Sequence, residues 1–288
     1  MGKIIIADNP LNELSIAREL LPPSLEAVFA KHGSAEFNAA LGDAECLVGF
    51  GDGSMDDAFY KHAPKLKLVQ LLSAGYDRID IESARRAGVA VCNNGGANST
   101  AVSEHAIMLM LAVSRSLVWQ HANVSGGRWR GNNASEVKLF EMYNKTLGIV
   151  GLGTIGRKTA KLARAFGMRV QYYDVARLSE EHAENIGVRF ALLEELLRTS
   201  DIVSLHVPLL PATKHMIGAE QLKLMKKSAY LINTCRGPVV DEPALIEALS
   251  NGTIAGAGLD VFDQEPPPRN RGKTTGTGYP CSRAPSIK

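Results

Sequence analysis

Three glycines with the spacing G-x-G-x-x-G offer the most predictable chemistry in this sequence: Gly151, Gly153 and Gly156. They follow an apolar run at 147–150 and open a helical pattern. The first glycine permits a tight turn, the second lets the backbone approach a phosphate, and the third lets the helix pack on the strand. The N–H groups of Thr154 and Ile155 would lie at a helix N-terminus, where an anion is favoured. The motif therefore predicts a site for the pyrophosphate of a dinucleotide.

An acidic residue, Asp174, ends the next apolar segment, 18 residues after Gly156. Its carboxylate could accept hydrogen bonds from both hydroxyls of an adenine ribose, and it would repel a 2′-phosphate. Arg177 could partly offset that repulsion, but the pattern favours NAD over NADP. The alternative is a solvated acid at a strand end. Strand, glycines, helix and acid together favour the cofactor site.

Further polar residues fall at or just after the ends of expected strands: His206, Thr234, Arg236 and Asp260. Ligands of doubly wound sheets bind beyond the carboxyl ends of the strands, and Pro208 ends the strand that precedes it. Taken singly, His206 could be a packed residue, Arg236 a solvated charge, and Glu265, before three prolines, a loop acid. The common position of the first four at one sheet edge, together with the family resemblance given below, favours a site.

The elements that must position these residues alternate between short apolar runs and helical patterns, which predicts an α/β fold with parallel sheets covered on both faces. In the first third, strands are expected at 3–7, 46–50, 66–72 and 89–92. Ser54 and Asp57 resemble a capping box that opens a helix. One long apolar helix is expected from Ser99 to Leu117, and a second βα series begins at Thr146.

Two βα series predict two doubly wound domains, a smaller flavodoxin-like one at 1–98 and a Rossmann domain at 99–268. Residues 269–288 contain five basic and no acidic residues, and show neither helical nor strand periodicity, so we expect a disordered tail. The apolar helix with Trp119 and Trp129 predicts a homodimer through residues 99–145.

The composition excludes several classes of function. The net charge of +2 provides no strong field for nucleic acid or a membrane surface, and no apolar run reaches the roughly 18 residues of a membrane span. The four cysteines are scattered without metal-ligand spacing, so no metal is expected. We expect a cytoplasmic protein. A nucleic-acid binder that uses the basic tail is a weak alternative, because five charges without a folded patch are usually a solvated end.

The cofactor motif, LGIVGLGTIG at 147–156 with the segment up to Asp174, resembles that of the D-isomer-specific 2-hydroxyacid dehydrogenase family. Four further segments extend the resemblance over about residues 1–268: LLSAGYDRID at 71–80, SLHVPLLPATKHMIG at 204–218, LMKKSAYLINTCRGPVVDEPALIEAL at 224–249 and GAGLDVFDQEPPP at 256–268. The resemblance implies an NAD-dependent oxidoreductase of small 2-hydroxy or 2-oxo acids. It implies a loop whose backbone amides hold the substrate carboxylate: Ser73, Ala74 and Gly75. It also implies residues that line the cofactor: His206, Val207, Pro208, Thr213, Thr234, Cys235, Arg236 and Asp260. Cys235 has no adjacent base, and we interpret it as backbone lining.

Oxidation of a 2-hydroxy acid needs a group that holds the substrate and a base that takes the hydroxyl proton. The resemblance implies Arg236 for the first role, and for the second a histidine paired with Glu265. No histidine follows Glu265 in this sequence, and neither His105, His121 nor His206 is spaced to pair with it. We therefore expect a C-terminally truncated member without the catalytic histidine. The alternative is a non-catalytic NAD-binding pseudoenzyme or a frameshifted product.

Overall fold

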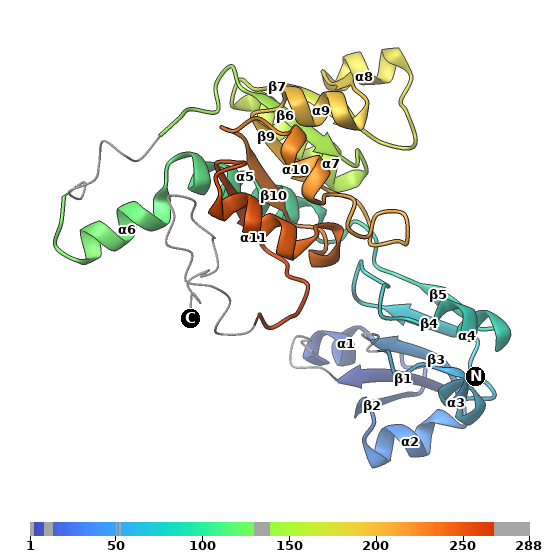
Figure 1. Cartoon of the computed structure of the whole chain (residues 1–288). Helices are drawn as coiled ribbons and strands as arrows, with labels where there is room; N and C mark the ends of the chain where they lie inside the picture. The colour runs from blue at the N-terminus through green and yellow to red at the C-terminus, as the bar shows by residue number, and fades with distance from the viewer. Residues whose placement is uncertain (1–2, 9–13, 50, 52, 130–138, 268–288) are drawn as a thin grey trace. The chain divides into compact units, whose positions relative to one another are not determined.

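The computed structural model describes residues 3–8, 14–49, 51, 53–129 and 139–267 (Figure 1). The chain divides into two compact units, residues 1–98 and 99–288, which are described separately below. The segment 269–288, for which a disordered tail is expected, lies outside the described residues.

Unit 1 contains a five-stranded parallel sheet of order β2-β1-β3-β4-β5, which is the flavodoxin-like order. Its strands are β1 (Lys3–Asp8), β2 (Ala27–Lys31), β3 (Ala44–Gly49), β4 (Leu68–Leu71) and β5 (Ala90–Cys92). Its helices are α1 (Leu14–Leu20), α2 (Ala35–Leu41), α3 (Asp57–His62) and α4 (Ile81–Arg86). The sequence did not predict β2, a strand of mixed burial without a clear apolar alternation.

The capping box expected at Ser54 and Asp57 is wrong. Asp56 caps α3, because its carboxylate accepts a hydrogen bond from the Phe59 N–H at 2.9 Å. An acidic side chain directly before the helix reaches the third N–H, whereas Ser54 lies two residues too early.

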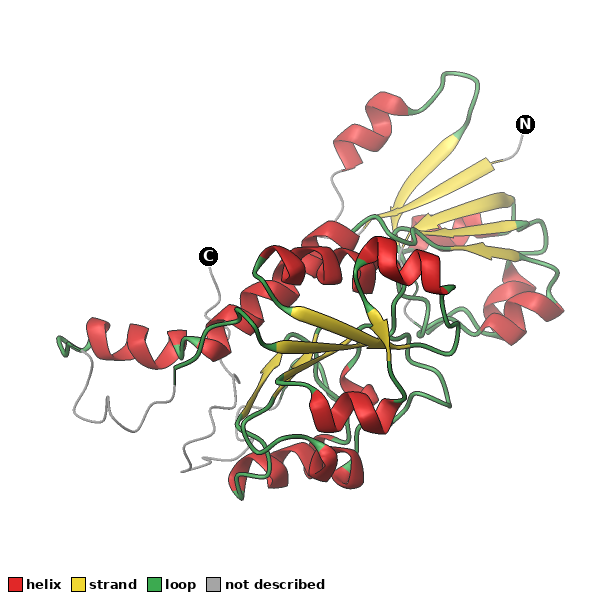
Figure 2. Cartoon of the chain, turned by 90° about the horizontal axis from the view of Figure 1, so that it is seen from above, coloured by secondary structure: helices red, strands yellow, loops and turns green. Residues whose placement is uncertain are grey.

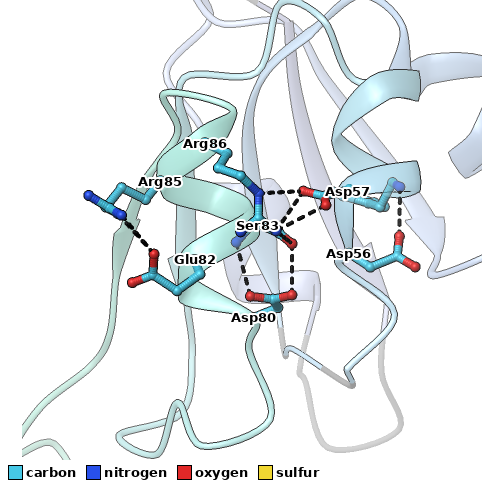
Figure 3. A network of polar contacts seen from close by, with 8 residues as sticks. Asp56, Asp57, Asp80, Glu82, Ser83, Arg85 and Arg86 are labelled. Carbon is cyan, nitrogen blue, oxygen red and sulfur yellow. Dashed lines mark hydrogen bonds and ion pairs between the residues drawn. The ribbon is translucent and has the colours of Figure 1, made fainter.

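A polar network joins α3 to α4 (Figure 3). The Arg86 guanidinium donates to both carboxylate oxygens of Asp57, at 2.9 and 3.0 Å, and to the Ser83 hydroxyl at 2.7 Å. Asp80 caps α4 by accepting from the Ser83 N–H and hydroxyl, at 2.9 and 2.7 Å. The Arg86–Asp57 ion pair is exposed, although Ser83 is buried, so the pair contributes more to the registry of the two helices than to stability.

Unit 2 contains a six-stranded parallel sheet of order β11-β10-β9-β6-β7-β8, which is the Rossmann order. Its strands are β6 (Thr146–Val150), β7 (Arg169–Tyr173), β8 (Arg189–Phe190), β9 (Ile202–Leu205), β10 (Tyr230–Asn233) and β11 (Gly256–Leu259). Its helices are α5 (Ser99–Ser114), α6 (Leu117–Ser125), α7 (Thr154–Ala165), α8 (Glu180–Ile186), α9 (Leu193–Thr199), α10 (Ala219–Leu224) and α11 (Glu242–Ser250). The α/β fold with two parallel sheets is thereby confirmed.

Helices cover both faces of the unit 2 sheet (Figure 2). Alternate residues of the strands enter two separate apolar clusters, as Ile202 and Val203 of β9 do. One cluster packs beneath α5 and α7, and the other beneath α9, α10 and α11. Burial on both faces explains why these strands are almost wholly apolar.

The single long helix expected from Ser99 to about Leu117 ends three residues earlier, at Ser114. The helix breaks after Ser114, where Ser116 has a φ of +48°, and α6 leaves at 64° to α5. The Ser114 hydroxyl donates to the Leu111 carbonyl at 3.0 Å, a local bond that bends helices. Among the described residues, no single helix is long and apolar enough to cross a membrane, although α5 and α6 together have a suitable composition.

Candidate active site

The glycine-rich turn of unit 2 lies between β6 and α7 and needs its glycines for different reasons. Gly151 has a φ of +95°, and a Cβ there would lie 2.5 Å from the His206 carbonyl oxygen. A Cβ at Gly156 would overlap the Gly151 carbonyl. By contrast, a Cβ at Gly153 would meet nothing within 4 Å. Packing therefore explains two of the glycines, and the third faces open space at the start of α7, where the N–H groups of Thr154 and Ile155 favour an anion.

Asp174 lies directly after β7 and is held by two backbone N–H groups. Its Oδ2 accepts from Leu152 N at 2.7 Å and its Oδ1 from Ala176 N at 2.9 Å. Arg177 is engaged elsewhere, with its guanidinium 4.8 Å from the centre of the Phe190 ring. The carboxylate is thus fixed beside the glycine turn.

The strand register aligns the predicted residues in one row. Val150, Tyr173, Leu205, Asn233 and Leu259 are paired across the sheet. The residues that follow them form a row along the carboxyl edge: Asp174, Gly151, His206, Thr234 and Asp260. Neighbouring strands lie about 4.8 Å apart, so the row spans about 19 Å. An extended dinucleotide has this length scale, with Asp174 at one end and Asp260 at the other.

Two buried polar atoms in the middle of this row have no hydrogen-bond partner within the described part of the chain: His206 Nδ1 and Thr234 Oγ1. Burial lowers the pKa of His206 to about 4, so the imidazole is neutral near pH 7. Its Nε2 lies 2.9 Å from the Ser204 hydroxyl. Since buried polar atoms are nearly always satisfied, these two atoms, with the open space at Gly153, fit the polar groups of a bound dinucleotide.

Cys235 follows in the same loop, and its thiol has low reactivity. Its N–H and thiol both lie 3.0 Å from Asn233 Oδ1. Burial raises the pKa of the thiol to about 11, so the reactive thiolate is scarce at neutral pH.

The loops that carry Arg236 and Glu265 pack on one another. A Cβ at Gly237 would overlap the backbone of Phe262, so the two loop segments can approach closely only because residue 237 is a glycine. The Arg236 guanidinium donates to the Cys235 carbonyl at 2.6 Å. The Glu265 carboxylate accepts from Phe262 N at 3.1 Å. The structure thus brings the guanidinium and the carboxylate to neighbouring loops of unit 2.

The segment after β9 has a mainly structural arrangement. The Thr213 hydroxyl donates to the Pro208 carbonyl at 2.6 Å and accepts from Leu210 N at 2.8 Å, which closes a turn. Val207 lies against the glycine turn, since its Cγ1 would be 2.9 Å from a Cβ at Gly151.

The substrate loop implied by the resemblance belongs to unit 1, at the carboxyl end of β4. Ser73 Oγ donates to the Gly75 carbonyl at 2.7 Å, and the Asn93 amide donates to the Ala74 carbonyl at 2.7 Å. None of the N–H groups of residues 73–75 donates to another described residue. Their carbonyls are tied back and their amides remain available to an anion.

One contact was missed by sequence reasoning. His105, on α5, places its Nε2 3.3 Å from Asp260 Oδ1. The two residues are 155 positions apart in the sequence, and the only signal was that His105 shares a helix face with the apolar residue Leu109. Among residues 3–8, 14–49, 51, 53–129 and 139–267, no group of three or more histidines, cysteines or acids could hold a metal ion.

The strand order, the glycine turn and the row of residues from Asp174 to Asp260 define unit 2 as a Rossmann dinucleotide-binding domain. The family model of the D-isomer specific 2-hydroxyacid dehydrogenase NAD-binding domain matches residues 107–275. The chain belongs to this family of oxidoreductases, which act on CH–OH groups.

Relatives and solved structures agree with that assignment. A glyoxylate reductase of Korarchaeum cryptofilum is 41% identical over 257 residues, which cover 89% of this chain and 74% of the relative. A glyoxylate reductase of Thermococcus litoralis is 46% identical over 228 residues, which cover 78% of this chain and 69% of the relative. The crystal structure of D-lactate dehydrogenase from Aquifex aeolicus, complexed with NAD and lactic acid, matches with a TM-score of 0.81 and 33% identity, covering 91% of this chain and 77% of that one. This chain is therefore shorter than the proteins it resembles.

Proposed function

We propose that this protein transfers a hydride between NAD and a small 2-hydroxy or 2-oxo acid, with glyoxylate the first substrate to test. The observation that carries the proposal is the row from Asp174 to Asp260, with unpartnered polar atoms on His206 and Thr234 between them. Glyoxylate reductases among the relatives support the choice of substrate.

Some residues of unit 2 bind the cofactor, and Arg236 binds the substrate. The segment 151–156 and Asp174 bind the pyrophosphate and adenine ribose, and the bound NAD supplies the hydride acceptor or donor. The planar guanidinium of Arg236 matches a carboxylate or the C2 oxygen of the substrate. In unit 1, the amides of 73–75 bind a substrate carboxylate, so unit 1 is the substrate domain.

A proton must also leave or reach the C2 oxygen, and the residues available for this step are poor bases. Arg236 stays protonated and cannot act as a base. His206, with a pKa of about 4, is a weak base at neutral pH. No histidine follows Glu265 in these 288 residues. We therefore propose that these 288 residues by themselves transfer the proton slowly, with a non-catalytic NAD-binding protein as the alternative function.

The test compares this chain with a version that carries a family-like C-terminus from a glyoxylate reductase. Single-turnover oxidation of NADH is followed by its absorbance with saturating glyoxylate or hydroxypyruvate. Loss of a general acid or base costs about 10²- to 10⁴-fold, so this chain should be at least about 10²-fold slower. Equal rates would refute the proposal, and undetectable turnover with intact NADH binding would favour the alternative.

We also propose a homodimer formed through residues 99–145. Described residues of this segment expose large apolar side chains, namely Leu117, Val118, Val124 and Trp129, and Trp129 is 80% exposed. Single exposed apolar residues are common, but several in one segment are what a subunit interface would bury. Sedimentation at micromolar concentration should give twice 31.0 kDa, and a purely monomeric species would contradict the proposal.

A further inference from the structure

His105 and Asp260 form a histidine–carboxylate pair at the carboxyl edge of the unit 2 sheet. The imidazole Nε2 lies 3.3 Å from Asp260 Oδ1, and the side chains are 37% and 46% exposed. A carboxylate has no proton to donate, so attraction between the two groups needs a proton on Nε2. The pair is thus partly open to a ligand that binds at this edge.

Backbone packing fixes the position of His105. Helix α5 packs against β10 and β11, and a Cβ at Gly258 would lie 3.1 Å from Leu109 Cβ and 3.5 Å from Val113 Cγ1. Glycine at 258 therefore lets the helix approach the strand closely. His105 lies one turn before Leu109, which is 6% exposed, so the buried face of the helix holds the imidazole beside the end of β11.

Backbone hydrogen bonding also fixes the position of Asp260 at the end of β11. Its N–H donates to the Asn233 carbonyl at 3.0 Å and continues the ladder between β10 and β11. It stands beside Thr234, at the opposite end of the row from Asp174. The contact with His105 Nε2 leaves most of the acceptor capacity of the carboxylate open. What remains suits a donor group, and the amide NH2 of a nicotinamide is such a donor.

We propose that His105 is a positioning residue that orients the Asp260 carboxylate toward the nicotinamide end of the bound cofactor. The inference rests on the proposed function, because it takes the nicotinamide as the group at this end of the row. His105 does not contact the reacting atoms in this role. It restricts the rotamers of Asp260, so that the carboxylate is in place before the cofactor binds.

The experiment compares two ligands that differ at one end. NADH and ADP-ribose share the adenine ribose and the pyrophosphate, but only NADH carries a nicotinamide. Both are titrated calorimetrically into the full 288-residue chain and three variants. His105→Leu removes the donor, His105→Gln keeps a donor near the position of Nε2, and Glu104→Gln changes an exposed neighbour on the same helix as the matched control.

His105→Leu should weaken NADH binding about 5- to 10-fold, as expected for the loss of a polar contact with a partly solvated carboxylate. ADP-ribose affinity should change by less than about twofold, His105→Gln should recover most of the loss, and Glu104→Gln should match the unmutated chain. Equal weakening of both ligands, or no change in either, would overturn the inference and leave His105 a structural residue. If neither ligand bound the unmutated chain, the proposed function itself would fail.

Discussion

The two ends of the cofactor site are built differently. At the Asp174 end, the glycine turn and the acid lie within residues 151–174, and the carboxylate is already held by Leu152 N and Ala176 N. At the Asp260 end, the residues come from loops after three strands and from α5, and buried polar atoms of His206 and Thr234 lack partners. One end is local in sequence, with its carboxylate held by backbone N–H groups, whereas the other is assembled from distant segments and has buried polar atoms without partners among the described residues. The two ends can therefore be tested separately by substitution.

The largest effects should come from the glycine turn. Gly151→Ala places a side chain at a φ of +95° and close to the His206 carbonyl, so it should lower the melting temperature and reduce NADH affinity at least about 100-fold. Gly153→Ala is the matched control for stability, since its Cβ meets nothing within 4 Å. Gly153→Ala should have the melting temperature of the unmutated chain and still bind NADH more weakly. Thermal unfolding and titration separate the two effects, and equal melting of both variants would contradict this account of the turn.

Asp174 should govern the choice between NAD and NADP. Asp174→Ala removes charged hydrogen bonds to the ribose and the repulsion of a 2′-phosphate, so NAD affinity should fall about 10- to 100-fold while NADP affinity falls less or improves. The measurement is a pair of titrations on each protein. Tighter binding of NADP than NAD by the unmutated chain would show that this interpretation of Asp174 is wrong.

His206 should make stability depend on pH. Its pKa lies at about 4 in the folded chain because of burial, below the ordinary value of about 6.5, so the unfolded chain binds the proton first as the pH falls. Stability should decrease between about pH 6.5 and pH 4, by at most about 3 kcal/mol and by less if water reaches the ring. Denaturant unfolding across this range should show a weaker dependence in His206→Asn. An unchanged profile would mean that the imidazole is solvated.

A smaller effect is expected from Asp201, at the amino edge of the same sheet. Burial alone would raise the pKa of this carboxyl, but hydrogen bonds from Lys226 and from Thr146 N, both at 2.8 Å, outweigh it and hold the pKa below its ordinary value of 3.8. Its stabilisation should be present above that value and disappear as the pH falls through the lowered pKa.

Asp201→Asn should cost about 1 kcal/mol at pH 7, because the pair is only partly buried. NADH affinity should not change, since the residue lies at the sheet edge away from the glycine turn. Loss of NADH binding would show that the two edges of the sheet are coupled.

The residues that could be predicted from the sequence lie mainly at the Asp174 end of the site, where the segments involved are close in sequence. The glycine turn and Asp174 could be predicted because their spacing in the sequence is short. The alternation of apolar runs with helical patterns was sufficient to predict the fold class. β2 and β8 were missed because an edge strand with mixed burial has a weak periodic signal. The break at Ser116 was missed because apolar composition continues across it. The His105–Asp260 contact depends on helix-to-strand packing over 155 residues, for which no local pattern exists.

The row at the carboxyl edge has a consequence for how this site can change. Each strand contributes one position, and the spacing between positions is set by backbone hydrogen bonds and not by the side chains themselves. Asp174 and Asp260 are separated by about 19 Å, beyond the distance at which substitutions usually influence one another. Cofactor preference and reactivity can thus be altered separately, by natural variation or by engineering, and the effects of changes at the two ends should simply add.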